Sequence, residues 1–359
     1  MKSIGRWLLL GVITLIGIFL LSNIRQMFLS VQPDQIKVTV NASISMQKLS
    51  EMLPGSRILN EKNGLLEVPY GKYFEYQGTA MTIKGVLRSS VVPLDAPIIS
   101  WRYYTYTVKA QVKNLFLRGD LGKYRDPYTR KEVTIAHAIP QMLLKTCTYF
   151  IPGLVLAIML STLVALWASV TKRIGAVLDG IHALLVGLPD FFLIVLIQLG
   201  AIYATKFVGH YVLLIVQVGN RTPFLIPFLT IALIPSVTMY GTLRVAIKRE
   251  LGQDYVVTAL AKGLTRREVL FSHVLRNVME DMLAILPKAT TLALASMAVA
   301  EAICGIGGLG GFIILPTYQG ISSMSSICVV LGLVAMAFHI LYALLRKHFV
   351  VRTEEVAGV

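Results

Sequence analysis

Long apolar runs alternate with short polar and basic segments over most of the chain. The first run covers residues 7–22 and is a little short of the roughly 20 residues that a helix needs to cross a bilayer. Five more runs cover residues 139–170, 174–203, 224–246, 283–303 and 327–345. The pattern predicts an all-α polytopic membrane protein with about six transmembrane helices.

Residues 31–136, between the first two runs, are polar, mixed in charge and interrupted by Pro and Gly. Three stretches have the alternation or the aromatic and β-branched content of strands, and they cover residues 36–45, 70–87 and 101–112. About a hundred residues are enough for one small core. We therefore expect a β-rich extracytoplasmic insert between helices 1 and 2.

The composition supports a membrane protein. Hydrophobic residues make up 55% of the chain and charged residues 15%, whereas soluble domains carry roughly 25% charged residues. The mean hydropathy is +0.68. The formal net charge of +15 does not indicate nucleic-acid binding, because membrane proteins collect Lys and Arg in their cytoplasmic loops.

The basic clusters also predict the topology. Under strict alternation of six spans, they fall on one side of the membrane, and this side is cytoplasmic by the positive-inside rule. The sequence therefore predicts that both termini are cytoplasmic. The clusters are Lys2 with Arg6, Lys172 with Arg173, the segment 247–280, and Arg346 with Lys347.

We call residues 247–280 the elbow, because they predict two short helices that meet at one bend. Gly263 is a natural end for the first helix, since Gly tolerates positive φ. Thr265 and Glu268 have the spacing of a capping box at the start of the second. We expect four apolar residues to share a small core, and three basic ones to stay solvated. The apolar residues are Leu260, Leu264, Val269 and Leu270; the basic ones are Lys262, Arg266 and Arg267.

The elbow resembles the EAA-type loop of ABC-importer permeases, in particular the oligopeptide, dipeptide and nickel branch. The matching residues are Asp254, Tyr255, Thr258, Ala259, Ala261, Lys262, Gly263, Leu264, His273, Leu275, Arg276 and Asn277. In that family the loop docks on the ATPase subunit. The resemblance therefore implies that residues 254–264 of the match, with Arg266 and Arg267, couple this chain to an ATPase. The alternative is an amphipathic cytoplasmic loop whose charges only set the topology.

A second stretch, residues 301–310, resembles the family signature Glu-x-x-Phe-x-x-Pro-Gly-Leu-Gly. It has Cys304 in place of the aromatic residue and Gly307 in place of the proline. An ionisable residue within a span is a candidate for function, so Glu301 is a candidate pathway residue. The glycines after it predict a flexible or tightly turned loop, either a gate or a plain connector. Those proposed for the gate are Gly305, Gly308 and Gly310.

Two further carboxylates lie within the predicted second span. Asp179 is close to Lys172 and Arg173, and we expect it to face the cytoplasmic boundary beside them. Asp190 follows Gly187-Leu188-Pro189, and we expect it to cap a helix after a proline break.

The sequence indicates no enzyme, metal or cofactor site. Both Gly-Lys pairs, Gly71-Lys72 and Gly122-Lys123, are followed by Tyr and not by the Ser or Thr of a phosphate-binding loop. The six histidines have no ligand spacing, and the three cysteines form no Cys-x-x-Cys pair. We expect no directly bound cofactor, with ATP used by partner subunits.

The resemblance implies a type I ABC-importer permease in the bacterial cytoplasmic membrane. The implied partners are a second homologous permease, two ATP-binding subunits, an extracytoplasmic solute-binding protein and membrane lipid, and the implied substrate is a peptide. The expected division is an N-terminal helix (1–30), an insert (31–136), a five-helix core (137–348) and a cytoplasmic tail (349–359). An ion-coupled secondary transporter and a membrane-anchored sensor or assembly protein are the alternatives.

Overall fold

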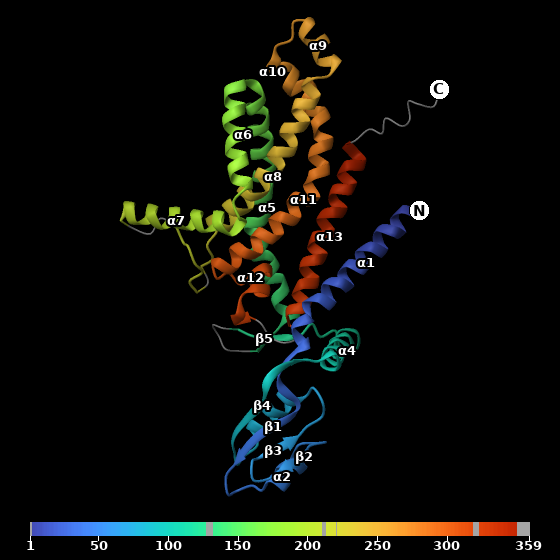
Figure 1. Ribbon diagram of the computed structural model, residues 1–359, viewed down its shortest axis with the longest axis vertical. Helices are drawn as coiled ribbons and strands as arrows, with labels where there is room; N and C mark the ends of the chain where they lie inside the picture. The colour runs from blue at the N-terminus through green and yellow to red at the C-terminus, as the bar shows by residue number, and fades with distance from the viewer. Residues whose placement is uncertain (1, 127–131, 210–212, 220, 319–322, 350–359) are drawn as a thin grey trace. The chain divides into compact units, whose positions relative to one another are not determined.

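The computed structural model describes residues 2–126, 132–209, 213–219, 221–318 and 323–349, and it contains two compact units (Figure 1). Unit 1 consists of Met1–Leu15 and Gly122–Val359, and unit 2 of Ile16–Leu121. The predicted tail, residues 349–359, lies outside the described residues from position 350 on.

Unit 2 is an antiparallel four-stranded sheet with helices. The strand order is β2-β3-β1-β4, and Ile36, Leu49 and Leu66 are fully buried in its core. The strands are β1 (Phe28–Val40), β2 (Arg57–Asn60), β3 (Leu65–Glu67) and β4 (Val86–Ile99); the helices are η1 (Ile24–Met27), α2 (Met46–Met52), α3 (Tyr73–Thr82) and α4 (Trp101–Arg118).

The predicted sheet is present, but the structure corrects two of the three predicted strands. Residues 73–82 and 101–118 are the helices α3 and α4. In α4, Ser100 caps the helix by accepting a hydrogen bond from the Tyr103 amide, and the buried Tyr103 and Thr107 lie one turn apart. The aromatic content suggested a strand, whereas the four-residue spacing of the buried positions is that of a helix.

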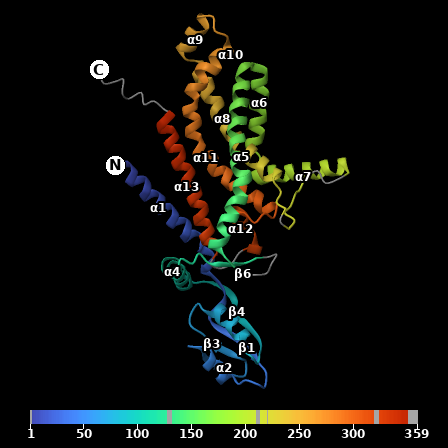
Figure 2. The same cartoon turned by 180° about the vertical axis from the view of Figure 1, so that it is seen from behind.

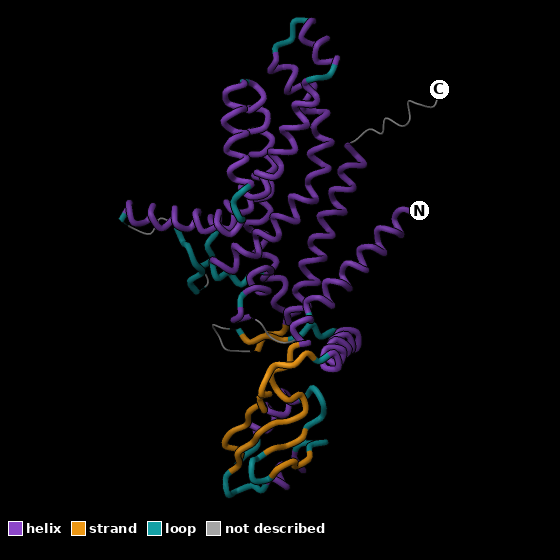
Figure 3. Tube along the Cα trace, viewed as in Figure 1, coloured by secondary structure: helices purple, strands orange, loops and turns teal. Residues whose placement is uncertain are grey.

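Unit 1 is almost entirely helical (Figure 3). Among the described residues, five helices are long and apolar enough to cross a membrane, namely α5, α7, α8, the continuous helix 266–303, and α13. The long helices are α5 (Ile135–Val170), α6 (Lys172–Val186), α7 (Asp190–Val208), α8 (Leu225–Leu251), α11 (Leu275–Ile303) and α13 (Ser323–Phe349). The short elements are β5 (Lys123–Arg125), β6 (Glu132–Thr134), α9 (Asp254–Ala261), α10 (Arg266–Val269), the π-turn η2 (Leu270–Val274), α12 (Leu309–Ile314) and η3 (Pro316–Tyr318). The prediction of a polytopic α-helical protein is confirmed.

The predicted first and second spans differ from the other four. The first is the helix α1 (Lys2–Ser22), whose side chains are described from Leu9 on, and Leu9–Ser22 is apolar. The second is not one helix, because the chain breaks between α6 and α7 at Gly187-Leu188-Pro189. Proline lacks an amide hydrogen and disfavours helical backbone in the residue before it. The proline break is confirmed, but the expectation that Asp190 caps α7 is wrong, since Pro189 is the N-cap and Asp190 is the first residue of the helix.

The helices α5, α8 and α11 form the centre of unit 1, as both views show (Figures 1 and 2). Buried residues from all three, among them Ala165, Leu243 and Leu286, make one continuous core. The outer face of α5 exposes large apolar side chains every four residues, and they are Ile151, Val155, Met159, Leu163 and Trp167. Such a stripe is typical of a face that meets lipid or another subunit.

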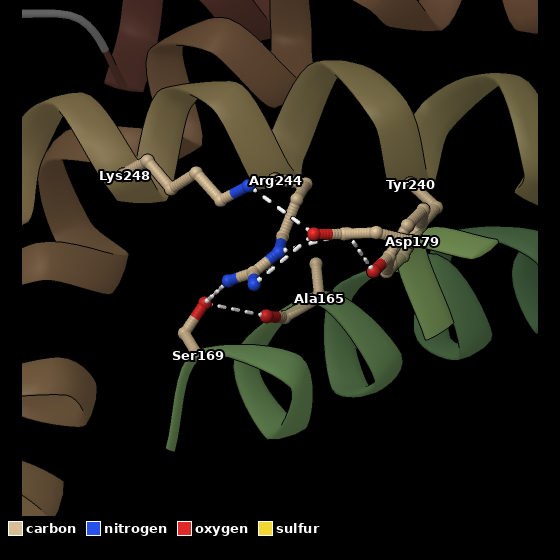
Figure 4. A network of polar contacts seen from close by, with 6 residues as sticks. All are labelled: Ala165, Ser169, Asp179, Tyr240, Arg244 and Lys248. Atoms are coloured by element: carbon tan, nitrogen blue, oxygen red, sulfur yellow. Dashed lines mark hydrogen bonds and ion pairs between the residues drawn. The ribbon is translucent and has the colours of Figure 1, made fainter. Parts of the chain in front are cut away.

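A polar network joins α5, α6 and α8 (Figure 4). The Asp179 carboxylate accepts hydrogen bonds from the Tyr240 hydroxyl at 2.7 Å, from Arg244 Nε at 3.1 Å and from Lys248 Nζ at 3.2 Å. Arg244 Nη1 donates to Ser169 Oγ at 2.8 Å. The charged partners of Asp179 are therefore Arg244 and Lys248 of α8 and not its sequence neighbours Lys172 and Arg173, while its place at the cytoplasmic boundary stays a prediction.

The two ion pairs of Asp179 predict unequal effects of substitution. Asp179→Asn leaves the largely buried guanidinium of Arg244 without its counter-charge, and we expect it to lower the free energy of unfolding by about 2 kcal/mol. Lys248→Met removes a largely exposed partner and should cost less than about 1 kcal/mol. Denaturant titration of the detergent-solubilised protein measures both, and equal losses in the two variants would contradict the assignment of Arg244 as the main partner.

Candidate functional site

The elbow projects from the ends of α8 and α11. Figure 1 shows α9 and α10 beyond the ends of α5 and α6, and the reverse view in Figure 2 agrees. After α8 the chain turns at Gly252, forms α9, bends at residues 262–265 and enters α10. The elbow is therefore a compact projection held by two long helices.

The bend has the predicted chemistry. Gly263 adopts φ +86°, a left-handed conformation that a residue with a Cβ rarely adopts. The Glu268 amide donates to Thr265 Oγ1 at 3.3 Å, and the Thr265 amide donates to the Glu268 carboxylate at 2.7 Å. The predicted helix end and capping box are confirmed.

The second helix of the elbow is not short. It passes from α10 through the π-turn η2 directly into α11, and together they form one continuous helix of 38 residues, 266–303. The predicted span began only at residue 283 because residues 266–281 contain many charges. Those charges lie mostly on the exposed side, while Val269, Leu270, Val274 and Val278 form a buried stripe at helical spacing.

This stripe and α9 attach the elbow firmly to the bundle. Val256 and Ala259 of α9 are buried with the stripe in the same core as Leu243 and Ile247 of α8. Two of the four residues expected in this core are elsewhere, since the side chains of Leu260 and Leu264 are 43% and 36% exposed. Rigid attachment means that a displacement of the elbow has to be shared by α8 and α11.

The outer side of the elbow combines apolar and basic residues. We call this surface the elbow face; it consists of Val257, Leu260, Leu264 and Phe271 with Lys262, Arg266 and Arg267, all exposed. Asp254, Thr258, Ala261 and Gly263 are also exposed, whereas Tyr255 is half-buried and Ala259 is buried. Eight of the ten residues predicted for coupling are thus accessible to a partner. Exposed apolar side chains close in sequence to exposed charged ones are typical of protein interaction sites.

Tyr255 has a structural role inside the elbow. Its hydroxyl donates to Glu250 Oε2 at 3.0 Å, and Asn277 Nδ2 donates to the same oxygen at 3.1 Å. Burial and the bond to Glu250 raise the pKa of Tyr255, because both favour the protonated hydroxyl that donates this bond. Two residues of the family match therefore join the ends of α8, α9 and α11 through Glu250, which sequence reasoning missed because nothing in its spacing marks it.

A polar cavity of about 480 Å³ lies beside this junction. Arg249 bridges across it to Asp281, with Nη2 and Oδ2 2.7 Å apart. The lining residues are Arg249, Glu250, Asn277, Glu280, Asp281, Ala284 and Arg346. Among the described residues, no group of three or more His, Cys, Asp or Glu side chains is arranged to hold a metal ion.

The second predicted site, around Glu301, is a closed polar hub. The Glu301 side chain is fully buried. Its carboxylate accepts hydrogen bonds from the Thr146 hydroxyl at 2.8 Å, from the Tyr149 hydroxyl and from the Gly311 amide at 2.7 Å. Thr146 in turn accepts from the Leu309 amide at 3.0 Å. The hub fastens α12 to α5 and α11, and in this structure the carboxylate faces no open path.

The glycines near Glu301 also differ from the expected loop. Gly305 lies in the turn after α11, but Gly310 lies inside the buried helix α12. Gly308 is the N-cap of α12, where a Cβ would collide with the Glu301 carboxylate. Close approach of backbone and carboxylate explains the glycine there. A gating role for Glu301, Gly305, Gly308 and Gly310 stays a prediction.

Comparison with known proteins adds independent evidence. Residues 153–355 match the family of binding-protein-dependent transport system inner membrane components. A dipeptide transport system permease protein of Escherichia coli K12 is 33% identical over 90 residues, which are 25% of this chain and 26% of that protein. An oligopeptide transport system permease protein of Mycobacterium bovis is 33% identical over 111 residues, 31% of this chain and 33% of that protein. The chain thus spans about a quarter to a third of the length of the curated relatives it matches.

The bend predicts a local effect of Gly263→Ala. A Cβ in the left-handed conformation costs about 1 kcal/mol, so we expect amide hydrogen exchange in residues 254–264 to be about fivefold faster. The matched control is Gly252→Ala, since Gly252 ends α8 at φ −88° and a Cβ there makes ordinary contacts. Equal exchange in the two variants, measured by mass spectrometry of the detergent-solubilised protein, would show that the turn does not require glycine.

The hub predicts an effect of Glu301 substitutions on a neighbouring thiol. Glu301→Ala leaves buried donors of Thr146, Tyr149 and Gly311 unpaired, at a cost of roughly 2–3 kcal/mol. In a Cys147→Ser, Cys328→Ser background, maleimide labelling of the buried Cys304 should accelerate more than tenfold. Glu301→Gln should have a smaller effect, because the amide oxygen still accepts. Unchanged labelling of Cys304 in Glu301→Ala would show that the hub does not hold this region closed.

Proposed function

The chain belongs to the family of binding-protein-dependent transport system inner membrane components, and from this membership we propose that it is the permease subunit of an ATP-driven peptide importer. The importer would comprise a second homologous permease, two ATP-binding subunits and an extracytoplasmic solute-binding protein. Peptides are supported as the substrate class by the names of the relatives, which transport dipeptides and oligopeptides.

The observation that carries the proposal is the construction of the elbow. Its inner side is part of the bundle core, and its outer side presents the elbow face. A surface that is exposed on one side and rigid on the other is suited to receive force from a partner. The basic side chains Lys262, Arg266 and Arg267 favour a partner surface with acidic groups.

The continuous helix 266–303 supplies a route for the force. At ~1.5 Å per residue, its 38 residues extend over roughly 55 Å, from the elbow face to the hub around Glu301. Movement of the ATPase subunits would displace the elbow and, through this helix, the contacts of α12 with α5. Such coupling requires that the ATPase contact the elbow face differently in its nucleotide-bound and nucleotide-free states.

The proposal predicts the effect of two changes to the elbow face. Leu264→Asp places a charge in the apolar part, and Arg266→Glu with Arg267→Glu reverses the basic part. Because these side chains are exposed, we expect normal membrane insertion, at least tenfold less copurification of the ATPase subunits and a matching loss of peptide uptake. A copurification assay from membranes and an uptake assay in cells measure these outcomes.

The matched control reverses two exposed lysines of unit 2, Lys62→Glu with Lys84→Glu, and should leave ATPase copurification unchanged. Full uptake with the reversed elbow face, or uptake in a strain without the ATPase subunits, would overturn the proposal and favour an independent transporter.

A further inference from the structure

The helix α4 of unit 2 carries an unpartnered apolar stripe. Its buried side, which includes Tyr103 and Thr107, packs on the domain core. Along the opposite side, Trp101, Val108, Val112 and Phe116 follow one another at intervals of seven, four and four residues, so they share one helix face. Trp101 is 66% exposed, Phe116 is 82% exposed, and the two valines are half-buried. An exposed apolar stripe on a helix that is already packed on its other side is typical of a surface that a membrane or another protein covers.

The same helix is strongly basic. Residues 101–118 contain Arg102, Lys109, Lys113 and Arg118 and no acidic residue. Positions 102, 109 and 113 form a row beside the apolar stripe, because they are again seven and four residues apart. Arg102 also lies over the ring of Tyr70, with its guanidinium carbon 4.4 Å from the ring centroid. An apolar stripe next to a basic row, with an aromatic residue at the end, is the pattern of a helix that lies in the membrane interface.

Contacts within unit 2 fix α4 to the end of the apolar helix α1. The Tyr104 hydroxyl donates to the Leu20 carbonyl in the last turn of α1 at 2.9 Å, and the Ser100 amide donates to the Met27 carbonyl at 2.8 Å. The ring of Trp101 meets that of Tyr104 edge-on, with the centroids 5.9 Å apart. The start of α4 therefore lies where the apolar helix α1 gives way to the first strand.

Further exposed apolar residues surround the same point. Phe28 pairs with Ile99 between β1 and β4, and the side chains of both are exposed. Figures 1 and 2 show α4 nearly end-on while α1 is seen from the side, so α4 runs across the direction of the last turns of α1. In a membrane that α1 crosses, a helix placed in this way across its end would lie along the membrane surface and not through it.

We propose that α4 lies in the headgroup layer of the membrane and binds anionic lipid. Trp101 and Phe116 insert at the boundary of the acyl chains, where aromatic side chains are favoured, and Lys109 and Lys113 contact the acidic headgroups. The helix anchors unit 2 at the bilayer in addition to α1. The row of basic residues favours a negatively charged surface. The contacts of α4 with the end of the apolar helix α1 favour lipid over a partner protein as that surface.

The test measures the depth of Trp101 in the bilayer. The full chain with Trp7→Phe and Trp167→Phe retains Trp101 as its one tryptophan, and it is reconstituted in vesicles of phosphatidylcholine and phosphatidylglycerol at three to one. We expect lipid with a nitroxide near the headgroup to quench Trp101 at least twofold more strongly than lipid with the nitroxide deep in the chain. Aqueous iodide should quench it little. Free quenching by iodide with none by either lipid would overturn the proposal.

A tryptophan elsewhere in unit 2 provides the positional control. Leu59 is exposed on the edge strand β2, whose partner β3 pairs with β1 near Ile36. Eight residues of strand, or roughly 25 Å, separate that point from Phe28. Leu59→Trp, with all three native tryptophans changed to Phe, should be quenched by iodide and not by nitroxide lipid. Lipid quenching at position 59 equal to that at Trp101 would overturn the assignment of the contact to α4.

The charge row has its own control. In the unchanged chain, lipid quenching of Trp101 should be stronger in the anionic mixture than in pure phosphatidylcholine. We expect Lys109→Gln with Lys113→Gln to reduce this increase at least twofold. Lys62→Gln with Lys84→Gln should leave the increase unchanged. A Trp101 that is shielded only after a second permease or a binding protein is added would show that a protein covers the stripe, and would overturn the proposal. Neither readout involves ATPase binding or uptake, so the result is independent of the importer role.

Discussion

The burial of one stripe of α10, η2 and α11 against α8 is the interaction on which the rest of the structure depends. Val269, Leu270 and Val274 have no exposed surface, so the elbow cannot shift without opening the core that α5, α8 and α11 share. Close-packed interiors transmit displacement rather than absorb it. The same packing therefore stabilises the bundle and would give the elbow the mechanical role proposed for it.

The two polar assemblies at the ends of this helix have different tasks. Near the elbow, Glu250 joins three chain segments by accepting from Tyr255 and Asn277, and it also pairs with Arg249, 3.5 Å away. At the far end, the donors to Glu301 are hydroxyl and amide groups, and through them it holds α12. Hydrogen bonds of this kind are costly to leave unmade, so α12 moves either as a unit with α5 and α11 or with loss of hydrogen bonds in the hub.

The sequence predicts best where local chemistry decides the structure. The bend at Gly263, the capping box of Thr265 and the restart of α7 at Pro189 all depend on residues within one turn of each other. Most of the apolar runs are predicted for the same reason, since their length and composition are local properties. The outward side of the elbow was also recognisable, because exposed basic residues and a family motif occupy it.

Prediction failed where tertiary contacts decide. Leu260 and Leu264 lie outside the core because the stripe beginning at Val269 already fills the space against α8. Asp179 pairs with Arg244, 65 residues away in sequence, and no spacing rule relates the two. The aromatic residues of α4 suggested a strand, since composition weighs β propensity and takes no account of which positions a neighbouring sheet will bury.

The elbow face and the stripe of α4 show that composition alone does not identify a partner. Both combine exposed apolar side chains with basic ones and few acidic residues. The elbow face covers a bend that projects past helix ends, with its backing in the bundle core, and such a convex surface can enter a pocket of another protein. The stripe of α4 lies on one regular helix and is tied by Tyr104 to the last turn of an apolar helix, and on this contact rests the proposal that it lies at a bilayer surface. In both proposals, the element that positions the surface is therefore the reason for assigning acidic side chains or lipid headgroups to its basic residues.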